Sequence, residues 1–128
     1  MAVLGIDYGL KHVGVAISYW EESSKPLGTF TLKEIWAKIP GWQTEYKLEK
    51  IVIGLPSGKM LDRVRAFGKK LNHTYNIEVD YQDETLTSFE AKKMLVENQV
   101  AKNKRRELLD AYSACLILDD YLRSKNES

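Results

Sequence analysis

Three acidic positions stand where a fold built on a central sheet would gather them. Asp7 ends the first apolar segment, Asp83 and Glu84 follow a later alternating segment, and Asp110 lies early in the last predicted helix. Carboxylates crowded into one site repel one another and shift their pKa values unless a cation joins them. Mg²⁺ prefers such oxygen ligands, and two such ions about 3.5–4 Å apart stabilise the attacking and leaving oxygens of an in-line phosphoryl displacement. The acids therefore predict a divalent-metal site suited to phosphoryl chemistry.

Each acid also has a purely structural interpretation. An aspartate shortly before a glycine, as Asp7 stands before Gly9, is commonly a turn former. Asp83 and Glu84 could instead favour the dipole of a following helix. Asp110 differs, because helical spacing places it on an inward-facing apolar stripe, where a carboxylate needs a partner. Together the three positions favour the metal site more than any one does alone.

No nucleophile paired with a histidine base competes with these acids. His12 and His73 lie in ordinary sequence contexts, and the single cysteine, Cys115, sits in an apolar run that predicts a core position. One cysteine also excludes a disulfide framework and a four-thiolate zinc site.

Length, hydropathy and charge narrow the class of protein. The 128 residues predict one domain over 1–128, large enough to bury a hydrophobic core. No apolar run approaches the roughly 20 residues that cross a bilayer, and the N-terminal segment has no basic leader, so a cytoplasmic protein without membrane contact is expected. The 19 basic and 18 acidic residues nearly cancel, whereas nucleic-acid binders usually carry excess positive charge. Either the chain binds no polyanion, or its acids and bases occupy separate regions.

The order of the predicted elements indicates a mixed α/β domain. Three antiparallel strands come first, and the helices and strands that then alternate predict parallel strands with right-handed crossovers and helices on both faces of the sheet. The predicted strands are Ala2 to Tyr8, His12 to Ser18, Leu27 to Leu32, Lys50 to Leu55 and Ile77 to Tyr81. The predicted helices are an amphipathic one from about Met60 to Leu71, one after a capping box at Thr87 to Glu90, and a long one over Glu107 to Leu122. Between Ile35 and Tyr46 the pair Pro40-Gly41 predicts a broken or late-starting helix.

Four blocks of this sequence resemble the YqgF-like (RuvX-type) family. Its members are described as Holliday junction resolvases and as nucleases that mature the small-subunit ribosomal RNA precursor. The blocks are Gly5-Ile6-Asp7-Tyr8-Gly9 with Lys11 and Val13 to Ser18, then Ile51 to Pro56, then Asp83 to Ala91, and finally Asp110 to Leu122. They span nearly the whole chain in order.

The resemblance implies a ribonuclease H-like fold, with a five-stranded mixed sheet flanked by helices. It also implies metal-dependent phosphodiester cleavage in which Asp7, Glu84 and Asp110 are the catalytic residues and the ligands of Mg²⁺ or Mn²⁺, with two ions expected. Asp83 is an additional acid beside them. In this arrangement Asp7 bridges the two ions, and Glu84 and Asp110 each complete one site.

Parts of the family pattern are missing from this chain. The family usually has threonine where Leu10 stands, and arginine where His12 and Thr85 stand. The loop after Pro56 is also shorter than usual. A missing arginine removes a fork-shaped phosphate donor, so these differences concern the substrate surface more than the metal site.

The expected partner is structured RNA, as in the ribosomal RNA precursor, or branched DNA. Phosphate contacts are expected from a set of basic side chains, namely Lys11, Lys59, Arg63, Lys104, Arg105 and Arg106. A monomer and a homodimer both remain open, because only a resolvase cutting two symmetric strands favours a two-fold dimer. The alternative function is a non-catalytic module of the same fold that binds RNA or a ribosome-assembly partner. An ATP-dependent phosphotransferase is disfavoured, since it needs a second domain to complete its cleft.

Overall fold

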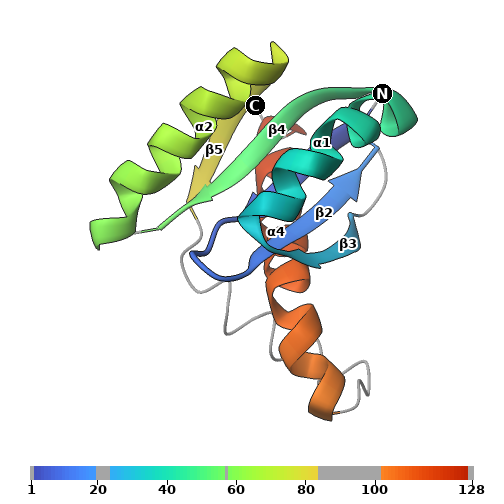
Figure 1. The fold of residues 1–128 in the computed structure, drawn as a ribbon. Coiled ribbons are helices and arrows are strands. Elements are labelled where there is room, and N and C mark those ends of the chain that lie inside the picture. The colour runs from blue at the N-terminus through green and yellow to red at the C-terminus, as the bar shows by residue number, and fades with distance from the viewer. Residues whose placement is uncertain (1, 20–23, 57, 84–101, 127–128) are drawn as a thin grey trace.

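A computed structural model describes residues 2–19, 24–56, 58–83 and 102–126, and the side chains of all these except 102–107 and 126. In chain order the elements are β1 (Ala2–Asp7), β2 (Val13–Ser18), β3 (Lys25–Phe30), α1 (Leu32–Tyr46), β4 (Leu48–Leu55), the 3₁₀ turn η1 (Gly58–Met60), α2 (Leu61–Tyr75), β5 (Glu78–Asp83) and α4 (Lys102–Asn126). Figure 1 shows their arrangement.

The five strands form one mixed sheet in the order β3-β2-β1-β4-β5. The pairs β1–β2 and β2–β3 are antiparallel, and the pairs β1–β4 and β4–β5 are parallel. This confirms the predicted mixed α/β class, with three antiparallel strands first in the chain and parallel strands after them. The parallel strands β1, β4 and β5 have their carboxyl ends on the same side of the sheet. Asp7 and Asp83 are the last residues of β1 and β5 on that side.

Helices cover both faces of the sheet (Figure 1). Helices α1 and α2 pack on one face, where Leu4 and Ile6 of β1 join their apolar side chains in one buried cluster. Helix α4 packs on the other face, where Val3 belongs to a second cluster. Cys115 of α4 is buried there, as predicted, and burial raises the pKa of its thiol to about 11. An unreactive core position follows from that pKa.

A polar network ties the C-terminal half of α4 to the sheet. The buried Tyr121 hydroxyl donates to Asp80 Oδ2 at 2.7 Å and accepts from Lys50 Nζ at 2.8 Å. Lys50 also lies 3.4 Å from a Glu78 carboxylate oxygen. A buried phenol needs partners of this kind, so the network fixes α4 against β4 and β5.

The prediction of a broken helix before β4 is wrong, because α1 runs without interruption through Pro40. Its N-terminus is a capping box, in which the Glu34 N–H donates to Thr31 Oγ1 at 3.2 Å and the Thr31 N–H donates to the Glu34 carboxylate at 3.0 Å. Pro40 has no N–H to offer the Trp36 carbonyl one turn earlier. The Tyr75 hydroxyl of α2 donates to that carbonyl at 2.9 Å instead. A tertiary contact thus supplies the bond that the proline removes.

Several element boundaries also differ from the sequence-based expectation. Strand β3 begins at Lys25 rather than Leu27, since Pro26 is tolerated on an edge strand where the register shifts. Leu32 instead starts α1. Strand β5 extends through Asp83, which is therefore a strand residue, and α4 begins at Lys102 rather than Glu107. The helix predicted after Thr87 lies outside the described residues.

We expect Tyr75→Phe to lower the free energy of unfolding by about 1–2 kcal/mol, because it leaves the Trp36 carbonyl without a donor. In a Pro40→Ala background the cost should shrink, since the restored N–H at position 40 can bond that carbonyl. Urea denaturation of the four proteins of this double-mutant cycle measures the difference. Equal costs in the two backgrounds would show that the hydroxyl does not compensate for the proline.

Candidate active site

Strand β1 carries Asp7 to the face of the sheet that α4 covers. Along β1, Val3 packs in the α4 cluster while Leu4 and Ile6 pack in the α1–α2 cluster. Because successive side chains of a strand alternate between faces, the Asp7 side chain points toward α4. Asp7 is half-buried and lies opposite Gly14 in the β1–β2 pair.

Gly14 is the point at which α4 comes closest to the sheet. A Cβ atom at Gly14 would overlap the main-chain carbonyl of Asp110, and one at Gly5 would lie 3.0 Å from the Ala114 carbonyl oxygen. Directly paired residues of two antiparallel strands have Cβ atoms only about 4.5–5.5 Å apart. The backbone of Asp110 therefore lies directly beside Asp7. Two of the three predicted acidic positions are brought together across 103 residues of sequence.

Asp110 is a half-buried carboxylate at this contact. Burial raises the pKa of its carboxyl above the usual value, and nearby His12 partly opposes the rise. Burial disfavours the ionised form of an acid, and a cation at this place would stabilise the ionised form of Asp110. The stripe predicted for this helix is confirmed, since Ser113, Ala114, Ile117 and Tyr121 are all buried.

His12 is a neighbour of Asp110 that the sequence analysis did not single out. It is exposed in the connection between β1 and β2, yet it lies close enough to act on the Asp110 carboxyl. Its position in the sequence could have identified it, because His12 stands where the family that this sequence resembles usually has arginine. The next residue back, Lys11, is also exposed in this connection.

Asp83 lies farther from Asp7 than the backbone of Asp110 does. It is exposed and pairs with Leu55 at the end of β5, two strands from β1, or about 10 Å at the usual strand spacing. Val79 and Tyr81 pack in the α1–α2 cluster, so alternation gives Asp83 that face, opposite to Asp7. Glu84 lies outside the described residues, and within those residues no three His, Cys, Asp or Glu side chains gather to hold a metal ion.

Helix α2 has a net positive charge. That helix carries four basic residues and one acidic residue, so its formal charge of +3 exceeds the +1 of the whole chain. Of the predicted phosphate contacts, Lys11, Lys59 and Arg63 are exposed. The side chains of Lys104, Arg105 and Arg106 lie outside the described part of the chain. A chain of near-neutral total charge therefore contains one helix that is clearly basic.

Three of the α2 cations were missed by the sequence analysis. Arg65, Lys69 and Lys70 are exposed on the helix together with Arg63. Four basic residues within eight positions of an amphipathic helix were a signal that could have identified this surface.

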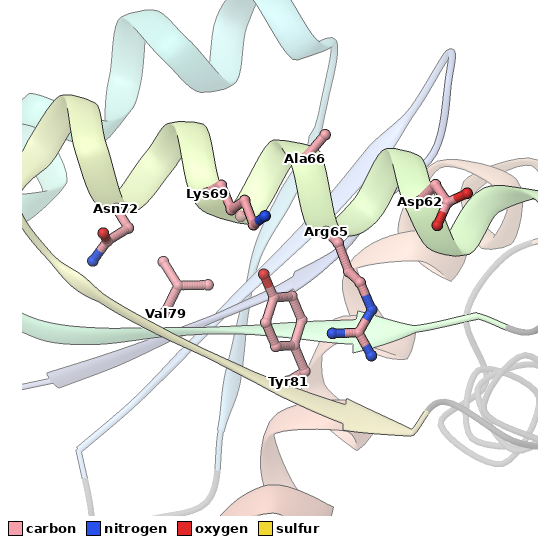
Figure 2. Close-up of a pocket in the computed structure, with 8 residues that line it drawn as sticks. Asp62, Arg65, Ala66, Lys69, Asn72, Val79 and Tyr81 are labelled. Carbon is pink, nitrogen blue, oxygen red and sulfur yellow. The ribbon is translucent and has the colours of Figure 1, made fainter.

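Two pockets flank α2. The larger, about 580 Å³, lies between α2 and β5, and Figure 2 shows the Tyr81 side chain rising from β5 toward the helix beside Arg65. The Arg65 guanidinium lies 5.7 Å from the centre of the Tyr81 ring, and Asp62 and Lys69 line the same pocket. The smaller pocket, about 310 Å³, lies between α1 and α2. Neither Asp7 nor Asp110 lines either pocket.

Among the helices that the structure describes, none has the length and apolar character needed to span a membrane.

Comparisons with known proteins give a consistent result. A family model described as "RuvX: Holliday junction resolvase" matches residues 1–124. A protein of Streptococcus thermophilus (strain ATCC BAA-491 / LMD-9) is 39% identical, and one of Streptococcus mutans serotype c is 36% identical, each over 95% of this chain and 97% of the relative. Both carry the name "Putative pre-16S rRNA nuclease".

Solved structures share the fold at low sequence identity. Fowlpox virus resolvase in complex with its substrate Holliday junction DNA has a TM-score of 0.62 at 16% identity, covering 97% of this chain and 98% of that chain. T. thermophilus RuvC in complex with a Holliday junction substrate has a TM-score of 0.58 at 16% identity, covering 97% and 96%. These likenesses confirm the ribonuclease H-like fold expected from the sequence.

Proposed function

This chain belongs to the RuvX family of Holliday junction resolvases, and on that premise we propose that it is a divalent-metal-dependent endonuclease that hydrolyses phosphodiester bonds of structured nucleic acid. The small-subunit ribosomal RNA precursor is the first proposed substrate, because the relatives at 36–39% identity are named for it. A four-way DNA junction is the second, because the family is named for it. An rRNA precursor as substrate implies action in the cytoplasm.

The observation that carries this proposal is the meeting of Asp7 and Asp110 at Gly14. The glycine lets the α4 backbone rest on the sheet beside Asp7, so the backbones of two acidic residues that are distant in the sequence lie next to each other. A purely structural contact between α4 and the sheet would not need two acids, because neighbouring carboxylates repel. A cation-binding role gives both acids a reason to be present.

The donor set suits a hard divalent cation. Asp7 and Asp110 offer carboxylate oxygens, which Mg²⁺ and Mn²⁺ accept as ligands, and a bound cation would oppose the rise that burial causes in the pKa of Asp110. We propose Glu84 as the third ligand and a pair of ions as the cofactor. Asp83 is the weaker candidate, because strand alternation gives it the opposite face of the sheet. A bound divalent cation lowers the pKa of water and neutralises charge on the phosphate.

The remaining residues of the site bind and orient the substrate in this proposal. Lys11 and His12 stand in the connection that leads away from Asp7, where they can neutralise a phosphate approaching the carboxylates. The basic side chains of α2 bind the phosphate backbone of the nucleic acid farther from Asp7 and Asp110. Because Leu10, His12 and Thr85 replace residues typical of the family, a module that binds without cleaving is the competing outcome.

We expect purified protein to cleave with Mg²⁺ or Mn²⁺ and to be inactive in EDTA. The substrates are an RNA that spans a mature small-subunit rRNA end with its precursor extension, a four-way DNA junction, and a linear duplex as control. The junction and the RNA separate the two proposed substrates, and size-exclusion chromatography with light scattering determines whether a dimer cuts the junction. Binding of either substrate without cleavage in any metal would favour the non-catalytic module.

A further inference from the structure

The smaller pocket beside α2 combines aromatic rings with basic side chains. It lies between α1 and α2 and is lined by Tyr8, Trp36 and Phe67 together with Arg63 and Lys70. We propose that this pocket binds an unpaired nucleotide of the strand held at the active site, its base against the aromatic rings and its phosphate on the two cations. The proposal rests on the proposed nuclease function and specifies the form of its substrate.

The aromatic residues form a preorganised wall. The ring of Phe67 is buried and lies 5.0 Å from the ring of Tyr8 and 5.6 Å from the ring of Trp36, measured between centroids. Trp36 is held from behind by Tyr75, with which it stacks at 5.7 Å. Tyr8 and Trp36 are only partly buried, so their rings are accessible from the pocket. Base stacking on such rings tolerates any base, because every base has a π-face.

The cations of the pocket complement a phosphate. Arg63 and Lys70 are seven residues apart on α2, which is two helical turns, so both project to the same side. Each is exposed, and the Lys70 ammonium lies 5.0 Å from the centre of the Trp36 ring. No carboxylate lines this pocket, whereas the larger pocket on the other side of α2 includes Asp62. The smaller pocket is therefore the more favourable place for an anion beside an aromatic surface.

The position of the pocket connects it to the carboxylates. Tyr8 follows Asp7 directly, so their Cα atoms are about 3.8 Å apart, and their side chains take opposite faces at the end of β1. A nucleic-acid strand that passes over the C-terminal end of β1 can present a phosphate to Asp7 and the next base to Tyr8. A base inside a duplex is stacked and paired, so only an unpaired one can reach the aromatic wall without paying for extrusion.

Fluorescence anisotropy in EDTA tests the pocket, because it measures binding without cleavage. The probes are a labelled single-stranded RNA of twelve nucleotides, the DNA of the same sequence, and the blunt duplex. We expect both single strands to bind more tightly than the duplex, and a preference between them identifies RNA or DNA as the source of the nucleotide. Trp36→Leu should weaken single-strand binding about tenfold, as expected for the loss of one stacked base.

Charge variants on α2 provide a matched pair. The double variant Arg63→Gln/Lys70→Gln removes the cations of the pocket, and the double variant Arg65→Gln/Lys69→Gln removes the same charge from the opposite side of the same helix. We expect the first pair to weaken single-strand binding clearly more than the second. All four side chains are exposed, so these variants test the pocket even if Trp36→Leu fails to fold, which circular dichroism reveals.

Three results would contradict nucleotide binding in this pocket. They are duplex bound as tightly as single strands, folded Trp36→Leu binding like the wild type, and equal losses in the two double variants. Cleavage of the wild type with Mg²⁺ or Mn²⁺ is measured separately. If the wild type cleaves and any of these three results is found, nucleotide binding in the pocket is refuted and the nuclease function is not. Pocket-dependent binding without cleavage in any metal refutes the nuclease alone.

Discussion

Asp7→Asn should reduce the rate of metal-dependent cleavage roughly a thousandfold while the protein stays folded. The substitution keeps the shape of the side chain and removes its charge, so a cation at the site loses a principal ligand. Metal catalysis contributes several kcal/mol to transition-state stabilisation, and about 4 kcal/mol corresponds to roughly a thousandfold in rate. Stability should be unchanged or slightly higher, because a charge beside the half-buried Asp110 is removed. Single-turnover cleavage and thermal unfolding measure the two effects.

Asp83→Asn is the matched control for this experiment. Asp83 is an exposed acid at the carboxyl end of β5, as Asp7 is at that of β1, but its side chain lies on the opposite face of the sheet. It should retain most of the activity. Equal losses in the two variants would indicate a general charge effect, and undiminished cleavage by Asp7→Asn would indicate a contaminating nuclease and refute the assignment of the site.

Gly14→Ala should be among the most damaging single-methyl changes in the chain. The added Cβ would overlap the main-chain carbonyl of Asp110, and backbone cannot rotate aside as a side chain can. Helix α4 must shift, which we expect to cost about 3 kcal/mol, near the upper end of the usual range for overpacking. A displacement of about 1 Å at Asp110 would also reduce cleavage about a hundredfold. Urea denaturation and cleavage rates measure these losses.

Gly41→Ala is the control for the loss of a glycine. Gly41 lies inside α1, and a Cβ there would meet no atom within 4 Å. Alanine in a helix interior is favoured over glycine by roughly 0.5–1 kcal/mol, so this variant should be slightly more stable and fully active. If Gly14→Ala were as stable as Gly41→Ala, α4 would not rest on the sheet at Asp110.

The sequence alone predicted the sheet and the strand that carries Asp7. An almost wholly apolar segment at Ala2 to Tyr8 indicated a strand buried on both faces, and β1 has that position. The helical stripe that includes Asp110 was likewise confirmed by the burial of its neighbours. These features follow from local periodicity, which is directly visible in a sequence.

What could not be predicted depends on contacts between distant residues. Pro40 forbids one hydrogen bond in any isolated helix, and only the distant Tyr75 hydroxyl makes the continuous α1 possible. Gly14 is a small residue in the sequence, and its closeness to Asp110 exists only once α4 lies on the sheet. His12 influences Asp110 for the same reason. Glu84, which the family resemblance implies as a ligand, remains a prediction.

The position of α4 has a consequence for the order of events during synthesis. Its apolar side covers Val3 and Val52, and its N-terminal half carries Asp110, so the proposed catalytic site is incomplete until α4 has docked. Long-range contacts of this kind form late, because they close the largest loops. A nascent chain whose α4 has not yet docked would therefore lack the proposed catalytic site. Completion of the hydrophobic core and the onset of activity would be one and the same step.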